Sequence, residues 1–290
     1  LLRPTQRRVL LWLAAVVVCS GGAPRGVSAQ NRPLHPVVPQ LAAAQQGAAG
    51  NKSPGEEARK GTPELLTDRP DFTESSFVVP LHSLQLEAGF TYTDEAGGAG
   101  QVFNVPELLL RYGFGRRTEL RVGVPDFTRS RLAGGRGSDF GDLYLGIKHQ
   151  LGPTDAKYGF ALIPAVTLPT GGRRVSSGAV DPEMVVTWSK DLSERWAVGG
   201  ILGFGLPTVD GERSFNFFPA VSFGRSISAR WGTFFEWAAE FPEGGGSSQL
   251  LHHGYTYALT PVSQLDLHFG FGITRAAPDF FIGAGYAVRF

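Results

Sequence analysis

The chain has 290 residues with 42% hydrophobic and 18% charged side chains, and its 39 glycines and 20 prolines make up about a fifth of it, short of the ~25–30% typical of low-complexity disorder. The 27 basic and 26 acidic residues nearly balance and form no basic stripe with interleaved aromatic residues, which excludes a nucleic-acid partner. Beyond the first thirty residues no run approaches the ~18 apolar residues of a membrane-spanning helix, which excludes a polytopic helical transporter.

Residues 1–29 have the pattern of a secretory signal peptide: three arginines, an apolar run, and a stretch of mostly small residues that ends at Ala29. Cys19 is the only cysteine, so neither an internal disulfide nor a zinc site of zinc-finger spacing can form. A rival interpretation makes Cys19 the lipid-modified residue of a lipoprotein, but the bulky Val18 stands where a small residue should precede it.

Residues 30–67 are rich in Ala, Gln, Gly and Pro. This stretch has no apolar stripe that would need to pack against a partner surface, so we predict a flexible linker. From residue 68 to the end, the chain alternates apolar with polar or small side chains in short runs broken by turn residues, which indicates β-strands. The twelve runs are 83–94, 105–112, 118–124, 142–151, 159–168, 183–190, 196–206, 215–225, 231–241, 250–259, 264–273 and 280–290.

The alternation places the large apolar side chains on one face of a sheet and the others on the opposite face. A soluble sandwich would carry many charged residues on its polar face, whereas here that face is mostly Gly, Ser, Thr and Ala. We expect these small residues to keep an interior space open. The inward candidates are Gly89, Gly123, Gly146, Ala220, Ser222, Gly254, Gly270, Gly272, Gly283 and Gly285.

Twelve charged residues of the runs fall in the polar phase. A Lys or Arg at mid-membrane on a lipid-facing surface costs roughly 2–4 kcal/mol, and selection of that size would clear one face of charge. We therefore predict an apolar face against lipid and a charged lumen, in which eight acids against four bases would mildly disfavour anions. The charged residues are Glu87, Glu107, Arg111, Glu119, Arg121, Asp142, Lys148, Glu183, Glu236, Glu240, Asp266 and Arg289.

The connections between the runs alternate in length. Short connections (113–117, 152–158, 191–195, 226–230 and 260–263) alternate with longer ones rich in Gly and Ser (125–141, 169–182, 207–214 and 242–249). This alternation is typical of transmembrane β-barrels, which have an even number of strands and both termini on the short-turn, periplasmic side. Trp188, Trp196 and Trp231 fall beside the short connections, where they would form half of an aromatic girdle.

The last run alternates apolar residues up to the C-terminal Phe290. It must pair with the first run, because an open strand edge in hydrocarbon leaves backbone groups unsatisfied at several kcal/mol each. The predicted fold is thus an all-β, antiparallel transmembrane barrel of about twelve strands over residues 68–290, in the outer membrane of a Gram-negative-type bacterium. Its expected partners are outer-membrane lipid, an unidentified small molecule, and the barrel assembly machinery through the strand that ends in Phe290.

Several short strings occur in a characteristic order, although no single one is diagnostic. With these strings and its C-terminal strand, the chain resembles, over about residues 65–290, the bacterial outer-membrane transporter family named for the meta-pathway of phenol degradation. The resemblance implies an outer-membrane barrel that passes small, aromatic or hydrophobic compounds, and it brings no catalytic residues. The strings are Thr67-Asp68-Arg69-Pro70-Asp71-Phe72-Thr73-Glu74-Ser75, Val79-Pro80, Gln85 to Tyr92, Gly141-Asp142, Leu168-Pro169-Thr170-Gly171 and Gln264-Leu265-Asp266.

The segment that holds Asp68, Arg69, Asp71 and Glu74 lies just before the first run. One hypothesis makes it a plug that folds against the periplasmic mouth or enters the lumen, and the other makes it a structural lead-in that caps the first strand. A barrel of about twelve strands lies between the eight-stranded kind filled by side chains and the 16–18-stranded kind with an open channel. A narrow or partly plugged passage is therefore expected.

His252 and His268 are predicted to point inward on neighbouring strands, near Asp266. A metal or proton-linked site is one interpretation of the pair, and ordinary hydrogen bonding in a polar lumen is the other. Neither a metal nor a cofactor is predicted. Ser247 and Ser248 lie close to His252 in sequence but lack the context that activates a nucleophile, so the chain is not expected to be an enzyme.

Three functions are compatible with the sequence. The first is an outer-membrane channel or transporter for small compounds, the second a structural or adhesive barrel with a closed lumen, and the third a secreted, soluble β-sandwich or propeller. A lumen of small and mixed-charge side chains sets no unique shape or charge, so the sequence does not identify the substrate.

Overall fold

The structure, a computed structural model, describes residues 65–152 and 158–290. The predicted signal peptide (1–29) and nearly all of the predicted linker (30–67) lie outside the described residues. The described part of the chain is almost wholly β-structure, and its one helical element is a 3-10 turn, η2 (Ala96–Gly98). Within that part, no helix has the length and apolar character needed to cross a membrane.

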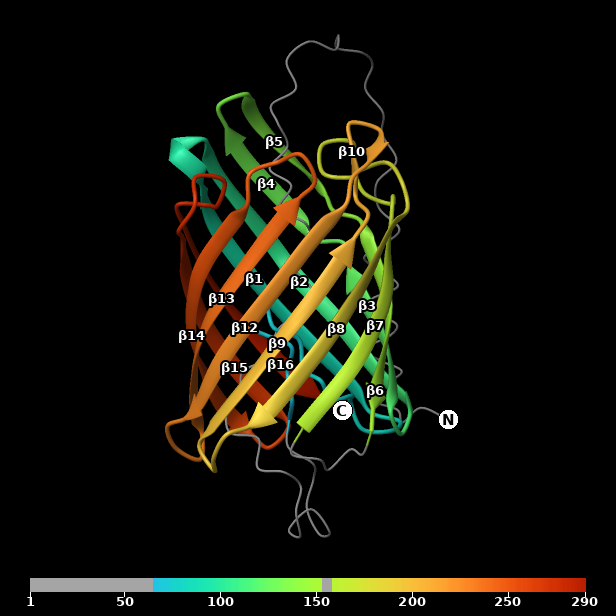
Figure 1. Cartoon of the computed structure of the whole chain (residues 1–290), viewed down its shortest axis with the longest axis vertical. Helices are drawn as coiled ribbons and strands as arrows, with labels where there is room; N and C mark the ends of the chain where they lie inside the picture. The colour runs from blue at the N-terminus through green and yellow to red at the C-terminus, as the bar shows by residue number, and fades with distance from the viewer. Residues whose placement is uncertain (1–64, 153–157) are drawn as a thin grey trace.

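The main sheet has fourteen strands, of which β4 and β5 form a hairpin at the rim, so twelve strands surround the barrel (Figure 1). Closure is made by β1 (Leu84–Glu95), which pairs antiparallel with β2 (Gly100–Gly115) on one side and with β16 (Phe280–Arg289) on the other. The predicted all-β barrel of twelve strands, closed by the last strand against the first, is confirmed. The other strands are β3 (Thr118–Val124), β6 (Leu143–Leu151), β7 (Tyr158–Leu168), β8 (Asp181–Asp191), β9 (Trp196–Gly205), β12 (Asn216–Ser226), β13 (Trp231–Pro242), β14 (Ser248–Thr260) and β15 (Ser263–Gly272).

Two connections expected to be loops contain further strands. Residues 125–141 hold β4 (Phe127–Leu132) and β5 (Gly135–Phe140), and β4 pairs with the outer half of β2. Residues 207–214 hold the short pair β10 (Thr208–Val209) and β11 (Glu212–Arg213), joined by Asp210-Gly211. Both turn residues have positive φ, 51° and 86°, which suits the tight hairpin turn that an Asp-Gly pair favours. These hairpins extend the wall beyond the long-loop end of the barrel (Figure 1).

The outer surface carries a belt of exposed large apolar side chains. Leu202, Phe223, Phe235 and Leu267 lie near the middles of their strands and are 42–50% exposed. Trp196 and Trp231 are exposed beside the short turns, while Trp188 is half-buried. Soluble monomers rarely expose a contiguous apolar patch larger than a few hundred Å², whereas a belt around the barrel is what contact with acyl chains requires.

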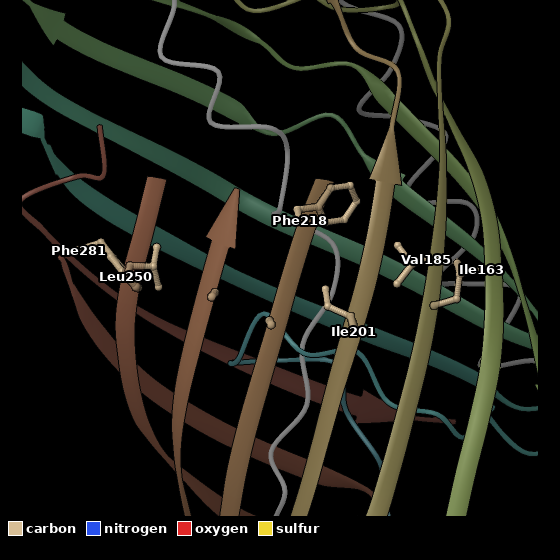
Figure 2. Close-up of a cluster of buried hydrophobic side chains, with 8 residues drawn as sticks. Ile163, Val185, Ile201, Phe218, Leu250 and Phe281 are labelled. Carbon is tan, nitrogen blue, oxygen red and sulfur yellow. The ribbon is translucent and has the colours of Figure 1, made fainter. Parts of the chain in front are cut away.

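One wall of the barrel interior is apolar (Figure 2). The cluster is contributed by β7, β8, β9, β12, β13, β14 and β16, and Phe72 from the segment before β1 packs against it. Large apolar side chains therefore point inward as well as outward, whereas the sequence pattern predicts them on the lipid-facing side. The cluster comprises Ile163, Val185, Ile201, Phe218, Ala220, Ala238, Leu250 and Phe281, each at most 8% exposed.

The space in front of several inward glycines is occupied by a side chain from elsewhere in the chain. The expectation that small inward residues keep the interior open is wrong at Gly89, Gly254, Gly270 and Gly285, because a Cβ there would overlap a side chain that occupies the space. Gly203, which was not among the expected inward residues, is in the same situation. Glycine is needed at these sites so that large inward groups can lie flat against the wall. The pairs are Gly203 with Phe218, Gly254 with Phe234, Gly270 with Phe281, and both Gly89 and Gly285 with Arg69.

Candidate functional site: the lumen and the segment before β1

Residues 66–79, which we call the lumen segment, run inside the barrel before the chain enters β1. Eleven residues of this stretch are buried, and they include charged groups as well as Pro70, Phe77 and Val79. Such burial requires partners for the charges, because an unpaired buried charge is costly. The other buried residues are Thr67, Asp68, Arg69, Asp71, Thr73, Glu74, Ser75 and Ser76.

Asp68 is the centre of the largest ion-pair cluster. Its carboxylate lies 3.2 Å from Arg111 Nη1 and 3.0 Å from Lys148 Nζ, and it also contacts Arg121. The backbone N–H of Ser75 donates to Asp68 Oδ1 at 3.0 Å, which folds the lumen segment around this carboxylate. Burial alone would raise the pKa of Asp68, but the three cations outweigh it and hold the pKa below its usual range.

Barrel carboxylates complete this cluster. Glu87 accepts hydrogen bonds from the backbone N–H groups of Asp68 and Arg69, both at 2.9 Å, and pairs with Arg111 at 3.0 Å. Glu119 pairs with Arg111 at 2.8 Å and accepts the backbone N–H of Val79 at 2.6 Å. The predicted lumen charges on β1, β2, β3 and β6 are thus brought together by the lumen segment.

Arg69 pairs with carboxylates of β2 and β15. Its guanidinium lies 3.0 Å from Glu107 and 3.5 Å from Asp266, in the space left by glycines on β1 and β16. Glu74 lies 3.1 Å from Arg121, and its backbone carbonyl accepts a hydrogen bond from Thr187. Asp71 is fully buried. Ser76 and Ser189 on β8 are joined by a hydrogen bond of 2.6 Å.

The tip of the lumen segment is held by Glu236 on β13. This carboxylate accepts the backbone N–H of Phe72 and the hydroxyl of Thr73, both at 2.7 Å. It also lies 2.8 Å from His252 Nδ1, and His252 Nε2 lies 3.0 Å from His268 Nδ1. Both nitrogens of His252 are therefore occupied, and the Phe72 ring packs 4.8 Å from its imidazole.

The remaining predicted lumen residues lie apart from this cluster. Asp142 sits near the long-loop end, where it accepts the backbone N–H of Gly171 at 2.8 Å. Glu240 is 8% exposed near the outer end of β13, opposite Ser248. Four of the eight acids counted from the sequence, Glu87, Glu107, Glu119 and Asp266, are paired with lumen cations, so the sum of charges says little about which ions the lumen favours. In residues 65–152 and 158–290, no three His, Cys, Asp or Glu side chains are arranged to hold a metal ion.

A cavity of about 930 Å³ opens at the long-loop end of the barrel. Its lining comes from β4, β5, the connection between β7 and β8, and the β10–β11 hairpin, while Asn216 and Phe218 of β12 also line it. Phe218 belongs to the apolar wall as well, so the cavity borders the apolar cluster directly. From the long-loop end inward, the interior therefore presents first the outer cavity, then the apolar wall, and then the lumen segment with its ion pairs.

Comparison with known proteins agrees with this architecture. The sequence profile of a family described as "Putative MetA-pathway of phenol degradation" matches residues 67–290. An outer-membrane channel from Pseudomonas putida F1 has a similar structure, with a TM-score of 0.56 and 16% identity over 74% of this chain and 98% of that chain. The NanC porin is similar with a TM-score of 0.51 and 9% identity, over 71% and 98% of the two chains. No curated protein matches the chain by sequence.

Proposed function

Because the chain belongs to this phenol-degradation family of outer-membrane barrels, we propose that it is an outer-membrane channel for small, apolar or aromatic compounds in which the lumen segment blocks the passage. The burial of residues 66–79 inside the barrel carries the proposal. The match to the family begins at residue 67 and so includes this segment. The apolar wall supports an apolar solute, since a lumen lined only by charged groups would favour water and ions.

The second candidate is a structural or adhesive barrel whose lumen stays closed. The ion pairs of Asp68 and Arg69 favour it to the extent that they hold the lumen segment permanently in place. The two candidates differ in one property: in a channel the lumen segment moves or leaves a path beside it, and in a structural barrel neither happens. Permeability therefore separates them.

We also propose that the protein is not an enzyme. Both ring nitrogens of His252 are engaged, by Glu236 and His268, so this histidine cannot act as the base for Ser247 or Ser248. Ser247 instead accepts a hydrogen bond from the side chain of Gln249 at 3.2 Å. The similarity of the fold to channels and porins is consistent with a role that needs no catalytic group.

Export and assembly are further parts of the proposal. The predicted signal peptide (1–29) would direct the chain across the inner membrane. The barrel assembly machinery would then recognise β16, in which Ile282, Tyr286 and the terminal Phe290 are exposed on the outer face. Deletion of Phe290 is a simple way to examine this last step.

A disulfide between residues 76 and 189 tests whether the lumen segment must move. The hydroxyls of Ser76 and Ser189 lie 2.6 Å apart, so Ser76→Cys with Ser189→Cys should form a reversible crosslink between the segment and β8. In liposome-swelling assays with small neutral aromatic solutes, we expect the oxidised variant to be several-fold slower than the reduced one. The single variant Ser189→Cys, oxidised in the same way, is the control and should swell like the unmodified protein.

The remaining outcomes assign the function. Equal swelling in the oxidised and reduced states would mean that solutes pass beside a fixed segment. No swelling in any state, with a barrel that is folded by its gel mobility, would favour the structural barrel instead.

A further inference from the structure

The outer face of the β4–β5 hairpin carries three exposed arginines. The hairpin stands at the long-loop end of the barrel (Figure 1), with Arg129 and Arg131 on β4 and Arg136 on β5. The other face of β5, at Gly137, is covered by the side chain of Arg174 from the connection between β7 and β8. Because alternate residues of a strand share a face, the three arginines lie on the side turned away from the barrel axis, although Arg136, next to the hairpin turn, also borders the outer cavity.

Two of these arginines oppose each other. Arg131 and Arg136 are Cα partners in the hairpin pairing, and Arg129 lies two residues from Arg131 on the same face of β4. Like charges directly opposite one another in a sheet destabilise the pairing. An anion between the two guanidinium groups would offset this repulsion, so the pair indicates an anionic partner from outside the chain.

The acids near the hairpin do not neutralise the three arginines. In residues 65–152 and 158–290, no carboxylate lies within ion-pair distance of them. Asp139, the acid of the hairpin, is in the other phase of β5 and lies against the connection at Gly172. Asp94 on β1 is in the same row of the sheet, but Gln101 on β2 separates it from Arg131. The outer face of the hairpin therefore keeps an excess of positive charge.

Aromatic side chains on the same face connect the arginines to the lipid-facing belt. Phe103 of β2 lies opposite Arg129 in the pairing, and its ring packs 6.0 Å from Phe90, which is 42% exposed on the outer surface of β1. At the base of the hairpin, the ring of Phe127 packs 5.4 Å from that of Phe140, which is 51% exposed. Toward the hairpin turn, the outer face thus passes directly from aromatic rings to guanidinium groups.

The arginines lie at the outer boundary of this belt. On β2, the stretch from Phe114 at the short turn to Phe103 spans about 25 Å across the membrane for a strand tilted by about 45°, which is the height of the apolar band of a transmembrane barrel. Arg129 lies beside Phe103, and Arg131 and Arg136 lie nearer the hairpin turn. The three guanidinium groups are therefore at the depth of the lipid headgroups of the outer leaflet.

We propose that the outer face of the β4–β5 hairpin binds a phosphorylated glycolipid of the outer leaflet, with its phosphates against Arg129, Arg131 and Arg136 and its acyl chains against Phe103 and Phe140. Guanidinium groups bind phosphate through two parallel hydrogen bonds, and a phosphate between Arg131 and Arg136 offsets their repulsion. The acyl chains of the same lipid meet the aromatic rings directly below the headgroup. This site lies on the outside of the barrel, so it is a function additional to the proposed passage of solutes through the lumen.

Diphosphoryl lipid A, and the same lipid with both phosphates removed, test the site. Native mass spectrometry of the purified full-length protein in detergent measures the affinity for each lipid. We expect the unmodified protein to bind diphosphoryl lipid A about ten- to one hundredfold more tightly than the dephosphorylated lipid, because each arginine near an anionic headgroup contributes. Combining Arg129→Gln, Arg131→Gln and Arg136→Gln should remove this preference and leave binding of the dephosphorylated lipid unchanged. Arg131→Gln alone, which also removes the like-charged pair, should weaken lipid A binding severalfold.

A second triple variant is the matched control. Arg116→Gln, Arg117→Gln and Arg230→Gln remove three exposed arginines from the short turns at the opposite end, so the net charge changes equally. This variant should bind both lipids like the unmodified protein. Gel mobility before and after boiling shows that each barrel is folded.

Three results would overturn the lipid site. The first is equal affinity of the unmodified protein for the two lipids, and the second is an equal loss of lipid A binding in the two triple variants, which would reflect net charge alone. The third is a second copy of the chain on this face, seen in the same spectra as a dimer that the hairpin variant abolishes. Swelling with neutral solutes reports on the channel separately, because these variants leave the lumen unchanged.

Discussion

Replacing Asp68 with alanine is expected to raise the single-channel conductance severalfold and to lower the free energy of unfolding by about 3–5 kcal/mol. The carboxylate is shared by Arg111, Arg121 and Lys148, all fully buried, so its removal leaves three cations short of a counter-ion. The lumen segment would also lose the contact that folds Ser75 back onto residue 68. Conductance in planar bilayers and denaturant unfolding in lipid vesicles measure the two effects.

Three further variants separate the charge from general damage. Glu194→Ala removes an exposed acid in the turn between β8 and β9 and should change neither quantity. Asp68→Asn keeps an acceptor for Ser75 but removes the charge, so it should retain most of the conductance increase. Adding Lys148→Met to Asp68→Asn restores the charge balance and should recover part of the lost stability. Unchanged conductance in folded Asp68→Ala would show that the ion pairs do not hold the passage closed.

Placing an arginine at Leu267 is expected to lower the free energy of unfolding in a bilayer by about 2–4 kcal/mol. Leu267 is 49% exposed near the middle of β15, between Tyr255 and Ala284 on the adjacent strands, so its side chain faces the acyl chains. The cost arises because a guanidinium at that depth loses its hydration. Equilibrium unfolding by urea in lipid vesicles gives the value.

The position of the arginine provides the control. Ile227 is 51% exposed beside a short turn, where headgroups and water can solvate a charge, so Ile227→Arg should cost only about 0–1 kcal/mol. Leu267→Ala separates the loss of the leucine from the gain of the charge. Equal costs for the two arginine variants would contradict the assignment of this surface to lipid.

The strands and their closure could be predicted from the sequence, because the side-chain period of two and the alternation of turn lengths are patterns among residues that lie close together in the chain. The face of the sheet that carries most of the charged residues could also be predicted, since a charge at mid-membrane on the lipid face is strongly selected against. The β10–β11 hairpin has a local signal in Asp210-Gly211, a strong turn pair, but each of its strands has two residues and is too short to show an alternating pattern.

The apolar inner wall left a weaker signal. Three strands contain adjacent phenylalanines, and a strand must send one member of such a pair inward. Phe218, Phe234 and Phe281 are the inward members, at most 7% exposed. Gly254 and Gly270 were expected to border open space, because the rings that pack against them, Phe234 and Phe281, lie on neighbouring strands whose register a single sequence does not encode.

The path of the lumen segment could not be predicted, because it depends on contacts between residues far apart in the chain. Asp68 meets Lys148 across 80 positions, and Phe72 meets Glu236 across 164. The sequence marked Asp68, Arg69, Asp71 and Glu74 as unusual but left two hypotheses for them. Only the three-dimensional register decides which barrel charges face each residue of the segment.

Hydrogen exchange of the backbone amides in residues 68–79, measured on the protein in lipid nanodiscs, examines the buried position of the lumen segment most directly. The amides of Asp68, Arg69, Phe72 and Val79 donate to buried carboxylates of the barrel. We expect these amides to exchange orders of magnitude more slowly than in an unstructured peptide of the same sequence. Exchange as fast as in the peptide, in a barrel whose strand amides are protected, would show that the segment lies outside the lumen.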